Sequence, residues 1–116
     1  MSQYARAVDL NHKPIVDGLR AHGYAVLNLS GVGKGCPDIL VGYVNTTTVA
    51  VHMSDGGWKK MQMPLPMNIL FEIKNPSARP HRKKAPAQQA FRDAWPGPCF
   101  VIESLDEALA ILQEKR

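Results

Sequence analysis

The chain has 116 residues, 45% of them hydrophobic, and a formal net charge of +4 at pH 7, which fits one soluble globular domain spanning residues 1–116. Two cysteines without metal-type spacing exclude a disulfide framework, and the sequence has neither an apolar run of membrane-spanning length nor a secretory leader, so we expect a cytoplasmic protein. The basic balance favours a polyanionic partner.

The first expected helix runs from Asn11, which can cap it, to Gly23, with Pro14 in its first turn. After a strand-like segment, a glycine-rich loop covers residues 30–36. This loop does not fit a P-loop, because Lys34 is followed by glycine where Ser or Thr is required. We expect the loop to give flexible access to a site, with Lys34 contacting a phosphate group.

The middle of the chain is rich in strand signals. Residues 37–43 form an apolar run typical of a buried strand, and residues 45–53 have the β propensity of another. Residues 58–67 contain two prolines and three methionines, so we expect irregular structure there. The apolar run 69–74 is expected to be the central strand of the sheet.

The last third of the chain predicts a helix, a strand and a second helix. Pro86 opens the first of these helices, whose apolar stripe ends at Trp95, so we expect Trp95 in the core. Cys99–Ile102 is a short strand, and residues 104–107 have the pattern of a capping box that starts the final helix. The predicted fold class is α/β, a mixed central sheet flanked by helices in the order α-β-β-β-α-β-α.

The most informative residues lie on the predicted central strand, where Glu72 and Lys74 share one face while Phe71 and Ile73 occupy the other. Charges within an apolar strand are costly to bury unless they are paired or bind an ion. Asp38 stands at the head of an earlier apolar run. An Asp, followed by a Glu-x-Lys on a neighbouring strand, is the arrangement that a magnesium-dependent nuclease uses.

These residues supply the groups that phosphodiester hydrolysis requires. Asp38 and Glu72 are the hard oxygen ligands that Mg²⁺ or Mn²⁺ prefers, and the main-chain carbonyl of Ile73 is a third candidate ligand. Lys74 is placed to hold the attacking water or the pentavalent phosphate, and its charge helps to keep the carboxylates ionised.

A basic segment without any acid follows the predicted central strand and contains Arg79, His81, Arg82, Lys83 and Lys84. Beside a phosphodiesterase site, we expect these residues to contact DNA phosphates without reading bases, and a solvated loop is the alternative. Trp58 is followed by two lysines and is a candidate for stacking on an unpaired base.

The motifs together resemble the VRR-NUC group of the PD-(D/E)XK nucleases. The resemblance rests on residues 35–38 before an apolar strand, on residues 71–74, and on residues 86–88 at the start of a helix; the closing strand and helix, residues 101–108, also look like those of the family. It implies a restriction endonuclease-like core, with Asp38 and Glu72 as metal ligands, Lys74 as the catalytic lysine and Gln88 as an active-site polar residue. Stand-alone members are similar to Holliday junction resolvases that work as homodimers, and the resemblance favours DNA processing in bacteria or phage-infected cells.

Two features depart from the family pattern. The family often has a glutamate on its first helix, where the nearest candidates here are Asn11, His12, Asp9 and Asp17. The link between the two acid-bearing strands is also long, with an insert at about residues 45–67 in place of a tight hairpin. This insert is a candidate dimer arm, substrate-binding flap or decoration.

The sequence therefore predicts a metal-dependent DNA endonuclease that hydrolyses phosphodiester bonds in branched DNA and acts as a homodimer. The first alternative is a nucleic-acid-binding module that has the same fold without catalysis, since the helix glutamate is missing. The second alternative is a nuclease for flaps or single strands.

Overall fold

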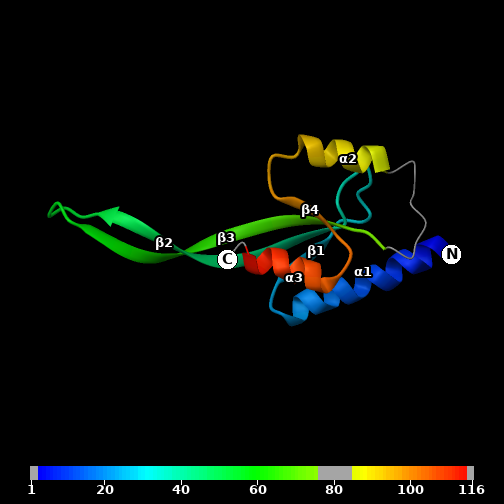
Figure 1. The fold of residues 1–116 in the computed structure, drawn as a ribbon, viewed down its shortest axis with the longest axis horizontal. Helices are drawn as coiled ribbons and strands as arrows, with labels where there is room; N and C mark the ends of the chain where they lie inside the picture. Colours follow the sequence, from blue (N-terminus) through cyan, green and yellow to red (C-terminus); the bar gives the residue numbers. More distant parts are fainter. Residues whose placement is uncertain (1–2, 76–84, 115–116) are drawn as a thin grey trace.

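The computed structural model describes residues 3–75 and 85–114, with side chains for residues 11–75 and 86–114. Its elements confirm the predicted α-β-β-β-α-β-α order (Figure 1). They are α1 (Gln3–Ala21), β1 (Ala25–Asn28), β2 (Ile39–His52), β3 (Trp58–Ile73), α2 (Ala85–Ala94), β4 (Cys99–Ile102) and α3 (Leu105–Glu114).

The four strands form one mixed sheet in the order β1-β2-β3-β4. The first two pairings are antiparallel, and β4 pairs with β3 in parallel after the crossover through α2. Helices α1 and α3 lie together on one face of the sheet, whereas α2 lies on the other (Figure 1). The C-terminal end of β3, residues 69–73, is therefore buried on both faces.

The core lies between the sheet and the α1–α3 layer. Phe71 and Ile69 of β3 are fully buried there, against Leu19 of α1 and Leu112 of α3. Because side chains alternate along a strand, the neighbouring Glu72 faces the α2 side instead. The predicted division of this strand into an apolar face and a charged face is confirmed.

Helix α1 is longer than predicted, because it begins at Gln3 and not at Asn11. Pro14 lies inside the helix and not in its first turn, where its ring removes one helical hydrogen bond. The apolar stripe that includes Ile15 and Leu19 packs into the core on the far side of the proline. We attribute the continuous helix to this packing, which outweighs the local preference to start at the proline.

Residues 58–67 are not irregular as predicted, because they form the first two-thirds of β3. The β2–β3 register is unbroken from Ile39↔Phe71 to His52↔Trp58, so residues 45–67 belong to one long hairpin. Its turn is closed by the Met53 N–H, which donates to the Gly57 carbonyl at 2.7 Å. Pairing with β2 therefore overrides the local signal of the prolines and methionines.

The prolines fit the strand because of their position in the ladder. Met53 and Gly57, the hydrogen-bonded pair at the turn, are both odd-numbered. Hydrogen-bonded and non-hydrogen-bonded pairs alternate along an antiparallel ladder, so the even-numbered residues form non-hydrogen-bonded pairs whose N–H groups point away from the partner strand. Pro64 and Pro66 are both even-numbered and lie opposite Thr46 and Val44. Neither proline would have donated a ladder bond, which is the condition under which a strand tolerates proline.

Trp95 does not lie in the core as predicted, because its side chain is 46% exposed. Its ring stacks on Phe91 with the centroids 5.2 Å apart, just beyond the end of α2. The predicted cap by Ser104 is confirmed, because the Glu107 N–H donates to the Ser104 hydroxyl at 3.2 Å. The Glu107 carboxylate accepts from the Glu103 N–H at 3.1 Å, one residue before the position that a capping box uses. Within the described residues, no helix is long and apolar enough to span a membrane.

Candidate active site

Glu72 is the buried acid on which the candidate site is built. The side chain of Glu72 is 3% exposed, and Lys74 Nζ lies 3.7 Å from its Oε1. Its other oxygen, Oε2, is shielded from solvent and has no hydrogen-bond partner among the described residues. A buried carboxylate oxygen without a donor is energetically unfavourable unless a cation or a proton occupies the position beside it.

Asp38 lies immediately before β2, next to the end of β3 that carries Glu72. Its N–H donates to the Phe71 carbonyl at 3.0 Å, and its Oδ2 accepts a 2.6 Å hydrogen bond from the Ile73 N–H. Both bonds join Asp38 to the end of β3, and the charge of Asp38 acts on Glu72, so Asp38 lies beside the buried acid. The structure thus brings together the two acids that the sequence predicts as metal ligands.

The charge of Asp38 acts on Glu72. Burial, and then the negative charge of Asp38, raise the pKa of Glu72 to about 7, against the lowering effect of Lys74 and Arg92. The pKa of the Cys36 thiol is also raised, by burial and then by the charges of both acids. A concentration of negative charge in a partly buried site favours a cation there.

The backbone of Lys74 is bound to β4, and its side chain is bound to α2. Its N–H donates to the Ile102 carbonyl of β4 at 2.8 Å, and its Nζ donates to Oε1 of Gln88 at 2.5 Å. The ammonium group remains 3.7 Å from Glu72, and 41% of its side chain is exposed. Gln88 therefore lies in the site as predicted, as an orienting partner of the lysine.

Arg92 is a site residue that the sequence analysis missed. It lies on α2 four residues after Gln88, and its charge acts on Glu72. Its Nη2 donates to Gln89 at 3.0 Å, but its shielded Nη1 has no hydrogen-bond partner among the described residues. The signal was present in the sequence, because residues four apart share one face of a helix.

The candidates on the first helix differ in their positions. Asn11 lies at the end of β3, where its Nδ2 donates to the Lys74 carbonyl at 2.8 Å. Asp17 forms an exposed ion pair with Lys13 at 2.6 Å, so its carboxylate is already engaged at the surface. His12 has a shielded Nε2 without a hydrogen-bond partner among the described residues, and the side chain of Asp9 lies outside them. Asn11 is thus the helix residue that contacts the site strand.

The glycine-rich loop packs against α2 beside the acids. Gly35 has φ +78, and a Cβ at this position would lie 2.3 Å from the carbonyl oxygen of Ala87. Glycine suits this position, because the positive φ disfavours a side chain and the contact with Ala87 leaves no room for one. Lys34 lies in the same loop, exposed and with φ 58; its predicted phosphate contact remains a prediction.

Several predicted DNA contacts are more distant or not described. Arg79, His81, Arg82, Lys83 and Lys84 lie outside the described residues, so their role stays a prediction. Trp58 is 71% exposed and contacts the ring of His52 with the centroids 4.8 Å apart. Its position on β3 puts it roughly 45 Å along the strand from Glu72 at about 3.3 Å per residue. Trp58 is therefore at the tip of the hairpin, away from the acids.

The site passes a chemical test for a divalent metal. Asp38 and the Glu72 oxygen that has no hydrogen-bond partner among the described residues are hard ligands. The Ile73 carbonyl faces the same strand edge as the Ile73 N–H, which bonds to Asp38. Within the described side chains, no three His, Cys, Asp or Glu residues group closely enough to hold a metal. Mg²⁺ binding with few carboxylates fits this set, because Mg²⁺ usually retains several waters.

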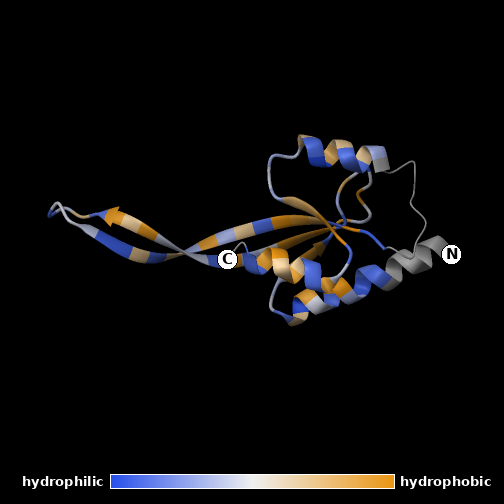
Figure 2. Ribbon diagram, in the orientation of Figure 1, coloured by the Kyte–Doolittle hydropathy of each residue, from blue (hydrophilic) through white to orange (hydrophobic). Residues whose placement is uncertain are grey.

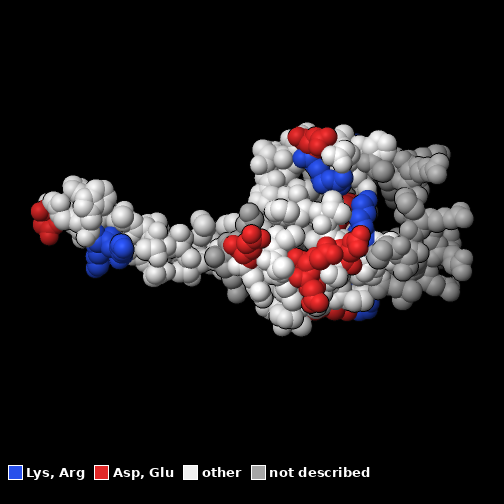
Figure 3. All heavy atoms as spheres, viewed as in Figure 1, with Lys and Arg blue, Asp and Glu red and all other residues white. Residues whose placement is uncertain are grey.

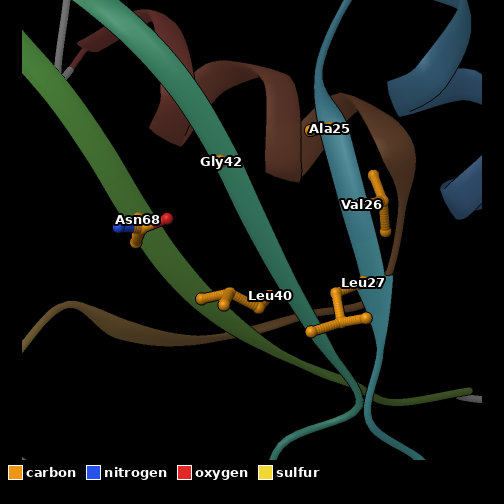
Figure 4. A pocket seen from close by; sticks show the side chains of 6 residues that line it. All are labelled: Ala25, Val26, Leu27, Leu40, Gly42 and Asn68. Atoms are coloured by element: carbon orange, nitrogen blue, oxygen red, sulfur yellow. The ribbon is translucent and has the colours of Figure 1, made fainter.

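A shallow apolar groove of about 230 Å³ lies elsewhere on the α2 side of the sheet (Figure 4). Figure 4 shows Leu27 and Leu40 side by side, with Asn68 further along the neighbouring strand. The groove is lined by Ala25, Val26, Leu27, Leu40, Gly42 and Asn68. It contains no titratable group, so it offers no chemistry of its own.

Comparisons of the chain with models of protein families, with curated proteins and with solved structures found no match.

Proposed function

We propose that the protein is a metal-dependent endonuclease that hydrolyses phosphodiester bonds in DNA, with branched DNA as its substrate. The observation that carries the proposal is the buried Glu72 oxygen that has no hydrogen-bond partner among the described residues, near Asp38 and beside Lys74. The resemblance of these residues to the VRR-NUC group of PD-(D/E)XK nucleases supports the same reaction.

In this proposal, Asp38, Glu72 and the Ile73 carbonyl hold Mg²⁺ or Mn²⁺. The bound metal supplies charge neutralisation at the phosphate and lowers the pKa of a coordinated water. The protein contributes the pre-organised acids: the Ile73 N–H fixes Asp38 at 2.6 Å, and burial restricts Glu72. Each acid is held by its strand before any substrate arrives, which reduces the reorganisation needed for catalysis.

Lys74 and Arg92 are the cations that would meet the substrate phosphate. Gln88 accepts a hydrogen bond from Lys74 and directs the ammonium group toward the acids, leaving two other ammonium protons to donate to phosphate oxygen or to the attacking water. Arg92 has a donor nitrogen without a hydrogen-bond partner among the described residues. Two cations from different elements can stabilise a transition state with more negative charge than the ground state.

The charge distribution favours one side for DNA. Asp106 and Glu107 lie in the first turn of α3, and Figure 3 shows acidic side chains gathered over this helix. On the α2 side it shows basic side chains beneath the helix and an acidic group at its outer edge. DNA phosphates are repelled by the first group and attracted by the second. The α2 side of the sheet, which carries Glu72, is the proposed substrate side.

A catalytically inactive DNA-binding module is the second candidate, and the position of Asn11 favours it. An amide that donates to the Lys74 carbonyl stands on the helix where a nuclease of this type often has a metal-binding glutamate. An amide is a neutral and weaker metal ligand than a carboxylate, so the site would rest on two acids alone. A nuclease for flaps or single strands remains the alternative within the same chemistry.

Cleavage of labelled four-way junction, flap, single-stranded and duplex DNA in Mg²⁺ or Mn²⁺ tests the proposal. We expect the wild type to nick the junction and EDTA to prevent nicking. Glu72→Gln should bind the junction without cutting it, whereas Glu114→Gln, an exposed acid at the end of α3, should cut normally. Binding without metal-dependent cutting of any substrate would favour the inactive module. Cutting limited to flaps or single strands would retain the site and reject the branched substrate.

A further inference from the structure

The hairpin of β2 and β3 extends beyond the body of the molecule as a two-stranded arm (Figure 1). We define the arm as residues 45–65. The molecule measures 67 × 31 × 20 Å, and the arm accounts for its long dimension. A two-stranded hairpin is marginally stable in water unless another layer covers one of its faces. The arm therefore needs a covering layer that the described part of this chain does not supply.

The arm has one apolar face. Its odd-numbered residues share this face, because the register with β2 is unbroken and side chains alternate. Met61, Met63 and Leu65 on this face are 44%, 46% and 42% exposed. The apolar arm face consists of Thr47, Val49, Val51, Met61, Met63 and Leu65.

The opposite face of the arm is mainly polar. Gln62 donates from Nε2 to the hydroxyl of Thr48 at 3.0 Å, and Thr46 and Lys60 occupy the same face. Figure 2 shows both hydrophobic and hydrophilic stretches on the arm, with a hydrophobic stretch at the end of β2. This amphipathic pattern is that of a sheet with one covered face and one solvated face, although the apolar arm face is uncovered in a single chain.

The edges of the arm are poorly suited to pairing with another strand. Pro64 and Pro66 lack the outward N–H groups that an added strand would require on β3. On β2, the Thr46 N–H is engaged by the side-chain oxygen of Asn45 at 3.2 Å. A partner is therefore expected to contact the face of the arm and not to extend its sheet.

We propose that the apolar arm face is a homodimer interface, covered by the same face of a second copy across a two-fold axis. A surface that packs against itself across a two-fold axis is self-complementary. If one residue of the first copy contacts a second residue of its partner, the reverse contact is also made. The inference rests on the arm alone and does not depend on nuclease chemistry.

Charge sets the relative direction of the two arms. Lys59 lies on the same face as Met61 but at the tip, opposite Val51. A parallel arrangement would bring the two Lys59 ammonium groups together, which is unfavourable. An antiparallel arrangement places the tips at opposite ends and allows Met61 and Met63, which lie midway along the face, to meet their counterparts.

The size of the face fits a dimer of moderate affinity. About ten residues per strand at about 3.3 Å each, with strands about 4.8 Å apart, give a face of roughly 30 by 10 Å. Two such faces with interdigitating side chains would bury on the order of 1,000 Å², near the lower limit for a specific interface. We therefore expect dissociation on dilution.

Sedimentation or light-scattering mass measurement tests the interface, with two variants of adjacent residues. The wild type should have about twice the 12.8 kDa mass of one chain at high concentration and dissociate on dilution. Met63→Glu places a charge on the apolar arm face and should give a monomer. Gln62→Glu introduces the same charge on the polar face and should remain a dimer.

A second variant covers the case in which Met63→Glu does not fold. Replacing residues 46–64 by Asn-Gly leaves the hydrogen-bonded pair Asn45↔Leu65 joined by a two-residue turn, and this short-arm chain should fold as a monomer. A wild type that is monomeric at all concentrations, or a dimer that persists in Met63→Glu and in the short-arm chain, would overturn the proposal. Loss of DNA binding by Met63→Glu in a monomeric wild type would assign the face to DNA instead. Glu72→Gln should leave the dimer intact. The mass measurement therefore tests the dimer interface independently of the cleavage assay that tests the nuclease proposal.

Discussion

At the scale of single residues, the raised pKa of Glu72 has a consequence for stability that depends on pH. Burial and Asp38 raise the pKa to about 7 from the usual 4.5. Below pH 4.5 the group is protonated in both folded and unfolded chains, so it contributes no pH dependence. Between pH 4.5 and about 7 the unfolded chain releases this proton while the folded chain retains it, so the folded state loses stability across this range and the loss is complete above about pH 7.

Glu72→Gln removes this penalty and should therefore stabilise the metal-free protein at high pH. The gain in the free energy of unfolding over wild type should be small at pH 5 and grow to about 2–3 kcal/mol at pH 8. Urea denaturation in EDTA at the two pH values measures it. Added Mg²⁺ should stabilise the wild type at pH 8 but not the variant, because the proposed ligand must be ionised. An equal difference at both pH values would show that the Glu72 carboxylate is not perturbed.

Arg92 is the other residue whose role can be tested alone. Its charge lowers the pKa of Glu72, so Arg92→Gln should shift the acidic limb of the cleavage pH profile upward. Loss of one donor to the developing phosphate charge should also lower the cleavage rate by about 10- to 100-fold. Arg92→Lys keeps the charge and should restore the pH limb, while recovering only part of the rate because one ammonium cannot reproduce the guanidinium geometry. An unchanged pH profile in Arg92→Gln would place the residue outside the site.

At the scale of elements, the contact between the glycine-rich loop and α2 holds the two halves of the site together. Gly35→Ala would place a Cβ 2.3 Å from the Ala87 carbonyl oxygen at φ +78. We expect it to destabilise the fold by about 1–3 kcal/mol and to displace Gln88 from Lys74, which lowers cleavage. Gly31→Ala is the matched control, because a Cβ at Gly31 meets no atom within 4 Å. Thermal unfolding and cleavage should separate the two variants, and equal behaviour would contradict the packing argument.

Strand β3 shows which features of the fold the sequence could predict and which it could not. Periodicity placed Glu72 and Phe71 on opposite faces of β3 correctly, because that alternation is fixed by the backbone. It failed at residues 58–67, where Pro64 and Pro66 suggested irregular structure although both occupy positions that tolerate proline. Such positions depend on pairing with β2, a long-range contact that local composition does not encode.

Local sequence patterns also do not predict which helix faces contact the sheet. Trp95 has the spacing of a core residue but lies past the end of the helix, where it stacks on Phe91 and remains 46% exposed. The spacing of four residues puts Arg92 on the same face of α2 as Gln88, but the sequence does not show that this face meets Glu72. By contrast, Asp38, Glu72 and Lys74 were found because two paired strands bring their polar positions together whenever the hairpin forms.

At the scale of the whole molecule, the arm and the proposed site lie at different ends of one continuous hairpin. Glu72 is in the body, whereas Met63 is on the arm. If the arm joins two copies, each dimer carries two sites related by a two-fold axis. A four-way junction also has two-fold symmetry, so the two sites can act on opposed strands during a single encounter.

This arrangement predicts a difference between nicking and paired cutting. On a supercoiled plasmid with an extruded cruciform, the wild type should produce linear DNA, because both cuts follow before the dimer dissociates. Met63→Glu keeps Asp38, Glu72 and Lys74 but should release nicked circles, since monomers cut one strand per encounter. Gln62→Glu, with the same added charge on the polar face, should behave as the wild type. The ratio of linear to nicked product over time measures the coupling, and a Met63→Glu protein that linearises the plasmid as efficiently as the wild type would separate the arm from the reaction.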